Sequence, residues 1–95
     1  MGLLDTTNYR NKSFKVSENI VCEKYEDCLI LLHLKKNKFF KLNSTGTVIF
    51  ELAQQGKTFE KIFELLKKKY SECDINSVYE YLKKLEIEEF LFLNE

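Results

Sequence analysis

The fold is decided by residues 28–46, which read CLILLHLKKNKFFKLNSTG. The run from Cys28 to Leu34 is almost continuously apolar, which is typical of a central strand that is flanked on both sides and largely covered. Residues 35–37 then form a short polar connection, in which Asn37 can adopt a positive φ at low cost, as a hairpin requires. Lys38–Leu42 completes the hairpin as the returning strand.

Helical spacing begins directly after this hairpin. Residues 43–45, Asn-Ser-Thr, offer side-chain oxygens that can cap a helix, and apolar residues then recur at helical spacing until Gly56. Thr58 can cap a second helix, whose apolar stripe lies beside a run of three lysines, and Asp74 can cap a third. The sequence therefore predicts three consecutive helices.

Weaker strand patterns flank this region. Ile20–Lys24 favours β structure and would precede the central strand through a polar turn. Residues 1–19 are predicted to be a leading arm, in which only Phe14 and Val16 alternate in the manner of a short strand. Phe90–Leu93 is apolar again and fits either a last helical turn or a short strand.

The length bounds the number of domains. A chain of 95 residues is long enough for one compact domain and too short for two. We therefore assign residues 20–95 to a single domain that follows the arm. Three strands followed by three helices predict an α+β fold, in which the helices pack on one face of an antiparallel sheet.

The composition excludes several classes of protein. Lys+Arg and Asp+Glu both total 15, so no net field draws the chain toward nucleic acid or an anionic membrane. The longest apolar stretch, Leu29–Leu34, is interrupted by His33 and is far shorter than the roughly 20 residues that cross a bilayer. Three cysteines without a Cys-x-x-Cys pair argue against a disulfide framework and a zinc site. We expect a cytoplasmic protein, in which Met1-Gly2 and Thr6 fit only the permissive pattern for myristoylation.

No group of residues indicates catalysis. His33 lies in an apolar strand without a carboxylate or cysteine at ligand spacing, so we interpret it as structural. Glu86, Glu88 and Glu89 cluster late in the third helix, and we interpret them as a solvated surface. The chain also lacks a glycine-rich phosphate loop, a Gly-x-Ser-x-Gly elbow and a histidine-rich motif. The sequence predicts a protein that is not an enzyme and that uses no metal or cofactor.

A family resemblance begins in the returning strand. The aromatic-rich strand at 38–42 is followed by Asn43, a small polar pair, a glycine, the helical sequence VIFEL and a Gly-x-Thr link at 56–58. This pattern resembles the PqqD-like family, the recognition elements of ribosomally synthesised and post-translationally modified peptides (RiPPs). The similarity runs from about Ile20 to Leu93. It departs from the family at residues 88–91, where Glu-Glu-Phe-Leu replaces a Gly-Leu-Leu or Gly-Leu-Ile ending, a change expected to leave the binding surface untouched.

The resemblance implies a winged-helix-like fold, a three-stranded antiparallel sheet followed by three helices. It also implies that the leader segment of a precursor peptide adds as a further strand against residues 38–42. An edge strand with unpaired N–H and C=O groups is a suitable template for such a peptide. Members present the leader to a partner enzyme, such as a radical SAM enzyme, a leader peptidase or a cyclase.

We expect the peptide to contact the third strand and the third helix. The candidate residues are Phe39, Phe40, Lys41 and Leu42 on the strand, and Val78, Tyr81, Leu82 and Leu85 on the helix. The pleat directs Phe40 and Leu42 to the core, so Phe39 is the better ligand-facing candidate. Tyr81 lies off the centre of the core stripe and presents an amphipathic ring at its margin.

Two alternatives stay open. A winged-helix DNA-binding protein could contact phosphates through Lys67–Lys69 and Lys83-Lys84, although the third helix has few side chains that read base edges. A structural subunit or homodimer could instead pair its third strand with a second copy, which would leave no free edge for a peptide.

Overall fold

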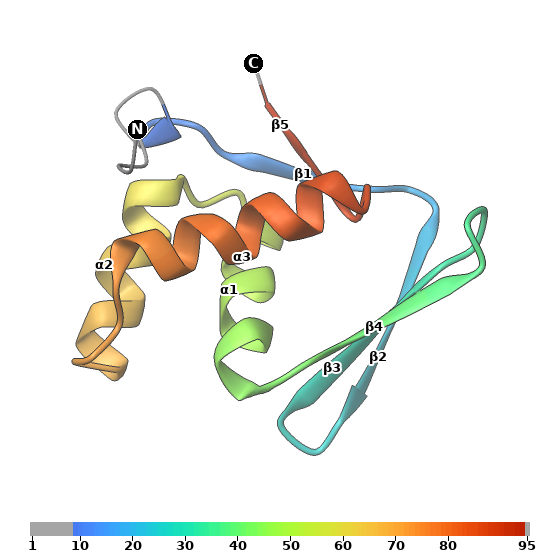
Figure 1. Ribbon diagram of the computed structural model, residues 1–95, viewed down its shortest axis with the longest axis horizontal. Coiled ribbons are helices and arrows are strands. Elements are labelled where there is room, and N and C mark those ends of the chain that lie inside the picture. Colours follow the sequence, from blue (N-terminus) through green and yellow to red (C-terminus); the bar gives the residue numbers. More distant parts are fainter. Residues whose placement is uncertain (1–8, 95) are drawn as a thin grey trace.

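Residues 9–94, which the computed structural model describes, contain three helices and five strands (Figure 1). In chain order the elements are β1 (Phe14–Val16), β2 (Ile20–Tyr25), β3 (Cys28–His33), β4 (Lys38–Leu42), α1 (Ser44–Gln54), α2 (Phe59–Lys69), α3 (Ile75–Ile87) and β5 (Leu91–Leu93). The predicted α+β class is confirmed, with three antiparallel strands followed by three helices. The myristoylation pattern at Met1-Gly2 lies outside the described residues.

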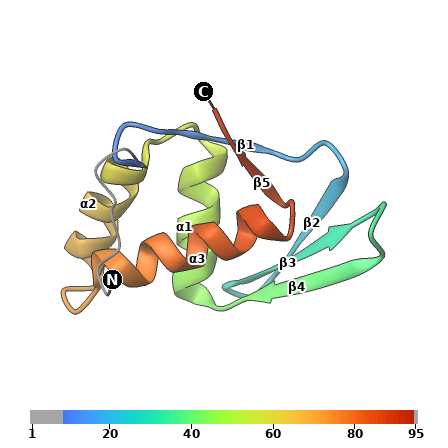
Figure 2. The ribbon, with the colours of Figure 1, turned by 45° about the horizontal axis from the view of Figure 1, so that its top comes forward.

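β3 is the central strand of the larger sheet, whose order is β2-β3-β4. Leu29 and Leu31 face the helices and are buried, whereas Leu32 is 40% exposed on the opposite face. The central position predicted for this strand is confirmed, but one face of the sheet stays uncovered. All three helices lie on the same side of the sheet (Figure 2), so they leave its other face open.

The local signals that end the strands and begin the helices are largely confirmed. Asn37 has a φ of 52° in the β3–β4 hairpin. The Asn43 side chain accepts a hydrogen bond from the Gly46 N–H at 2.8 Å, and Thr58 caps α2 in the same way. Asp74 occupies the N-cap position of α3 but makes no capping bond to the backbone.

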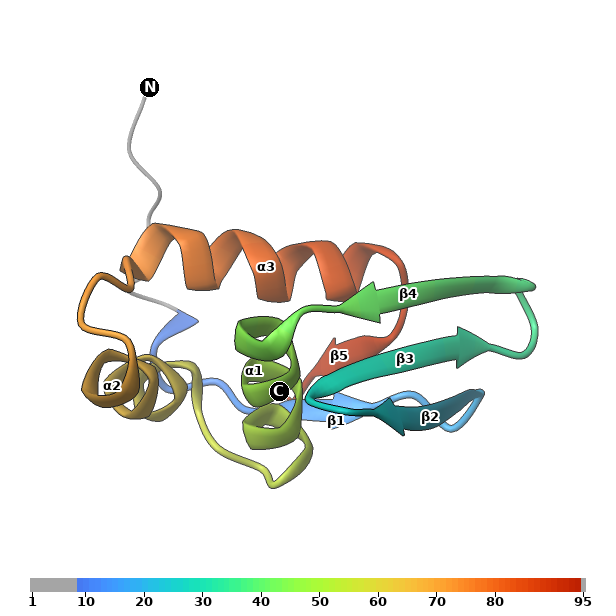
Figure 3. The same ribbon diagram turned by 90° about the horizontal axis from the view of Figure 1, so that it is seen from below.

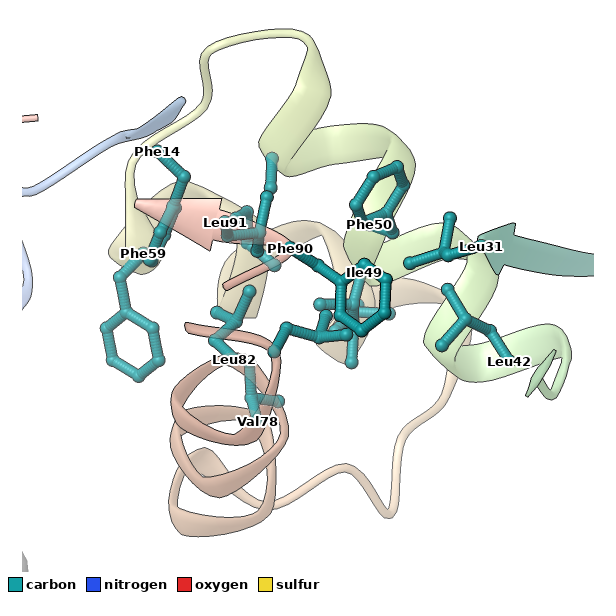
Figure 4. Close-up of a cluster of buried hydrophobic side chains, with 14 of the residues drawn as sticks. Phe14, Leu31, Leu42, Ile49, Phe50, Phe59, Val78, Leu82, Phe90 and Leu91 are labelled. Atoms are coloured by element: carbon teal, nitrogen blue, oxygen red, sulfur yellow. The ribbon is translucent and has the colours of Figure 1, made fainter. Parts of the chain in front are cut away.

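The core joins the sheet, all three helices and the segment before β2. Phe50, Leu31 and Leu42 meet where α1 packs against the sheet, and Phe90 lies beside them (Figure 4). Tyr9 and Phe14, from the predicted leading arm, are also buried. The arm is therefore packed into the domain from Tyr9 onward.

The pairing of β1 with β5 explains why the arm is packed. These strands form an antiparallel ribbon of their own, in which Phe14 lies opposite Leu93. The Tyr9 ring contacts the edges of Phe59 and Tyr79, and its hydroxyl donates to Glu86 at 3.2 Å. Burial is the main cause that raises the pKa of Tyr9, so the hydroxyl stays protonated at neutral pH. The tail at 90–93 is thus a strand, one of its two predicted states.

Phe14→Ala tests whether the arm is part of the folded unit. Phe14 is only 3% exposed, so its truncation should lower the free energy of unfolding by about 3 kcal/mol in urea denaturation. Phe92→Ala is the matched control, since Phe92 lies in the same ribbon but is 43% exposed and should cost less than about 1 kcal/mol. A loss for Phe14→Ala below about 1 kcal/mol, no larger than that for Phe92→Ala, would show that Phe14 does not contribute to the core.

Candidate functional site

β4 is an edge strand with free backbone groups. The Leu34 N–H donates to the Asn19 carbonyl at 2.7 Å, which identifies this cross-strand pair as a hydrogen-bonded one and fixes the alternation along the sheet. Even-numbered residues of β3 therefore bond to β2, and odd-numbered residues bond to β4. The N–H and C=O groups of Phe39 and Lys41 consequently point away from the sheet. In residues 9–94 no other strand pairs with this edge.

α3 lies beside that edge (Figure 3). Ser77, Tyr81, Lys84 and Glu88 recur at helical spacing and share a face of the helix. The Lys84 amine lies 5.3 Å from the centroid of the Phe40 ring, within the range of a cation–π contact. We call the free edge of Phe39 and Lys41, together with this α3 row, the β4–α3 surface.

Ion pairs join the hairpin to the C-terminal end of α3. Lys38 pairs with Glu88, and the Lys36 amine lies 3.2 Å from the Glu89 carboxylate. The hydrogen bond and charge of Lys38 lower the pKa of Glu88, with smaller contributions from Lys36 and Lys84. The expectation that residues 88–91 leave the candidate surface untouched is therefore wrong, because Glu88 lies at one end of it.

A small open pocket of about 130 Å³ continues the surface beyond the last residue of β4. Its walls include Asn43, Gly46, Cys73, Val78 and Tyr81. A Cβ atom at residue 46 would lie 2.0 Å from the Tyr81 hydroxyl oxygen, so the glycine allows the tyrosine to pack directly on α1. Burial raises the pKa of both the Tyr81 hydroxyl and the Cys73 thiol, so both groups are protonated and uncharged at neutral pH.

The predicted site residues lie in two layers. Phe39 is 69% exposed and Lys41 is also exposed, as the pleat predicts. Phe40 is partly buried and stacks on Phe90, with ring centroids 5.7 Å apart. Tyr81 is partly buried at the pocket. The other four, Leu42, Val78, Leu82 and Leu85, are 0–1% exposed, so they support the surface from beneath, and Val78 also lines the pocket.

Three residues of the α3 row were absent from the sequence prediction. Ser77, Lys84 and Glu88 lie four residues before, three after and seven after Tyr81. Helical spacing from Tyr81 could have found them, since positions three and four apart share a face. The prediction instead followed the apolar stripe, which is the face that packs on the core.

The described residues outside the β4–α3 surface offer few groups suited to metal binding. The described residues hold no group of three or more His, Cys, Asp or Glu side chains that could bind a metal ion. His33 is buried, and its Nδ1 accepts a hydrogen bond from the Lys36 N–H at 3.3 Å, so it supports the hairpin. Across residues 9–94, no helix has the length and apolarity to span a membrane.

Two lysines named for DNA binding are engaged within the protein. Lys83 lies 3.4 Å from the Glu86 carboxylate, and Lys84 lies over the Phe40 ring. The Glu86 carboxylate offsets the charge of Lys83, whereas Lys84 keeps its charge beside the neutral Phe40 ring.

The fold and this surface define a small winged-helix-like α+β domain with an open sheet edge. Residues 28–91 match the family described as Coenzyme PQQ synthesis protein D (PqqD). The match spans more than half of the chain, so the protein belongs to the PqqD family, as the sequence resemblance indicated.

Two solved structures are similar to this chain. The first, described as TbiB1 in complex with the TbiA(beta) leader peptide, is 30% identical over 81% of this chain and 93% of that chain, with a TM-score of 0.72. The second, described as lasso peptide synthetase B1 complexed with the leader peptide, is 15% identical over 84% of this chain and 98% of that chain. Its TM-score of 0.75 shows that the fold is shared. No curated protein sequence matches the chain.

Gly46→Ala tests the contact between α1 and Tyr81. The added methyl group would overlap the tyrosine ring, so it should lower the free energy of unfolding by about 1–3 kcal/mol. In a Tyr81→Ala background the same change should instead stabilise α1 by up to about 1 kcal/mol, because alanine is the better helix former. A double-mutant cycle in urea measures both values, and additive effects would contradict the contact.

Proposed function

We propose that this protein binds the leader segment of a RiPP precursor peptide and presents it to a modifying or processing enzyme. The leader adds as a strand on β4, in the space beside α3. The observation that carries this proposal is the free backbone of Phe39 and Lys41, two residues whose N–H and C=O groups face an unpaired edge. The family and the leader-peptide complex of a 30% identical relative support it.

Backbone pairing would supply affinity without depending on the peptide sequence. Each residue of β4 that faces the edge offers one donor and one acceptor, so a peptide in antiparallel register would form two hydrogen bonds with each. The leader peptide is disordered until it binds, and the conformational entropy that it loses on binding reduces the affinity. Pairing with β3 holds the strand on one side, and the exposed Lys38–Glu88 pair adds a weak contact to the end of α3.

Side chains of the β4–α3 surface would supply the preference for particular peptides. Phe39 and Lys41 flank the added strand on the outer face, and Phe40 and Tyr81 flank it on the face of α3. Successive residues of a strand point to opposite faces, so neighbouring residues of the peptide would contact different side chains of the protein, and each would be selected independently. Leu42, Val78, Leu82 and Leu85 hold these four side chains in position from the core.

The protein would act by recognition and not by catalysis. The Lys38–Glu88 pair is an exposed ion pair, and the Tyr81 hydroxyl and the Cys73 thiol of the adjoining pocket both stay protonated, so none of these groups is an activated nucleophile. The chemistry would belong to the partner, a cytoplasmic radical SAM enzyme, leader peptidase or cyclase. Residues 20–95 would form the recognition domain, with the segment from Tyr9 packed against it.

Proline substitution at Lys41 tests strand addition directly. Lys41→Pro removes the N–H that faces the peptide and leaves the β3–β4 bonds intact, because the neighbouring Phe40 makes those bonds. Compared with Lys41→Ala, it should weaken leader binding roughly tenfold, the equivalent of about 1.4 kcal/mol. Fluorescence anisotropy with the leader half of a precursor encoded beside this protein provides the measurement.

Cys22→Pro is the matched control for that substitution. By the same alternation, the Cys22 N–H faces the free edge of β2, on the opposite side of the sheet. Loss of the Cys22 N–H should leave leader binding unchanged. In the same assay, duplex DNA should not compete with the leader for the wild-type protein. Equal weakening by proline at both edges would contradict binding at β4.

Light scattering separates peptide binding from self-pairing. If β4 is free in solution, the protein is a monomer or a dimer joined elsewhere, and leader binding adds only the mass of the peptide. If two copies paired through β4, saturating leader would convert dimers to monomers, because both compete for the same backbone groups. We expect no such conversion, and a peptide-induced loss of mass would contradict a free edge.

A further inference from the structure

The uncovered face of the sheet carries an ordered pattern of side chains. Val21, Leu32 and Phe39 lie directly opposite one another across the three strands. They are 44%, 40% and 69% exposed, so the row is an apolar stripe that faces solvent and ends at the free edge of β4. A strand added at that edge would place one side chain next to Phe39 and extend the stripe.

The neighbouring row has a different character. Glu23, Ile30 and Lys41 lie opposite one another, so opposite charges occupy the two edges of the sheet. Two strand spacings separate Glu23 from Lys41, roughly 10 Å, with Ile30 between them. Within residues 9–94 Lys41 forms no ion pair. A strand added at β4 would bring one side chain next to this lysine.

The charges around β4 favour an acidic side chain at the position next to Lys41. Lysines at 35, 36, 38, 41 and 84 lie on or beside the hairpin, and only Glu88 and Glu89 are paired with any of them. The excess is positive in a protein of zero formal net charge. The lowered pKa of Glu88 is consistent with this local field.

We infer that the bound leader carries an acidic side chain next to Lys41 and a large apolar side chain, two residues away, next to Phe39. This inference rests on the proposed function and specifies its substrate. Successive residues on one face of a strand are two apart, which fixes the spacing. An antiparallel peptide runs opposite to β4, so the acidic residue precedes the apolar one, in the order acidic-x-apolar.

Selection from a display library of random twelve-residue peptides tests the pattern. The wild-type protein should enrich peptides with Asp or Glu two residues before Phe, Tyr, Leu or Ile. Selection on Lys41→Glu should replace the acidic position by Lys or Arg, and selection on Phe39→Ala should relax the apolar position. Lys68→Glu changes the net charge equally on the distant helix α2 and should leave the pattern unchanged.

Affinities of synthetic peptides made from the enriched sequences then quantify the pairing. Lys41→Glu should weaken an acidic-x-apolar peptide about fivefold, and a peptide with Lys at the acidic position should recover that loss. Lys68→Glu should change the affinity less than twofold. An unchanged affinity for Lys41→Glu would overturn the inference.

The outcomes distinguish this inference from the proposed function. Enriched peptides that bind Lys41→Pro much more weakly than Lys41→Ala, yet lack the acidic-x-apolar pattern, would overturn the inference and leave strand addition in place. The reversed order, apolar-x-acidic, would show that the peptide does not run antiparallel to β4 and would overturn the inferred order. Peptides that bind both variants equally, or a library without enrichment, would overturn the proposed function and this inference with it.

Discussion

The burial of Phe90 fixes the position of α3 relative to the sheet, and the β4–α3 surface depends on it. Its ring is fully buried, lies nearly parallel to Phe40 at an interplanar angle of 12°, and meets the edge of His33. Its N–H donates to the Leu85 carbonyl at 2.9 Å, and its carbonyl accepts from the Ser17 N–H. One residue thus joins the end of α3, the hairpin and the segment after β1. Without this anchor, α3 would still pack on α1, but its C-terminal end would lose the stacking of Phe90 on Phe40 that joins it to β4.

Two levels of structure make the surface suitable for an extended segment. The alternation of hydrogen bonds, which depends on backbone geometry alone, exposes the polar groups of Phe39 and Lys41. The pleat directs their side chains to the uncovered face and directs Phe40 toward α3. The backbone is therefore available for binding any strand, while the two faces impose different chemistry on alternate residues of that strand.

Local signals predicted most of the fold, and contacts between distant segments account for the rest. The hairpin and the three helices depend on periodicity, turn residues and caps such as Asn43, all of which lie within a few residues of one another. The β1–β5 ribbon joins residues almost eighty positions apart, so its pairing has no local signature. Phe39 and Tyr81 could be predicted because the pleat and the helical period set their directions. Lys84 and Glu88 were missed because they resemble solvated residues, although helical spacing places them on the same face as Tyr81; their contacts with β4 appear only in the folded structure.

The β1–β5 ribbon also determines how this domain can be joined to other chains. It brings Phe14 and Leu93 together as neighbours, away from the β2-β3-β4 sheet (Figure 1). A segment joined after Leu93 would therefore leave the molecule from this ribbon and not from the free edge of β4. A partner unit joined there would leave the backbone of Phe39 and Lys41 accessible to an extended segment.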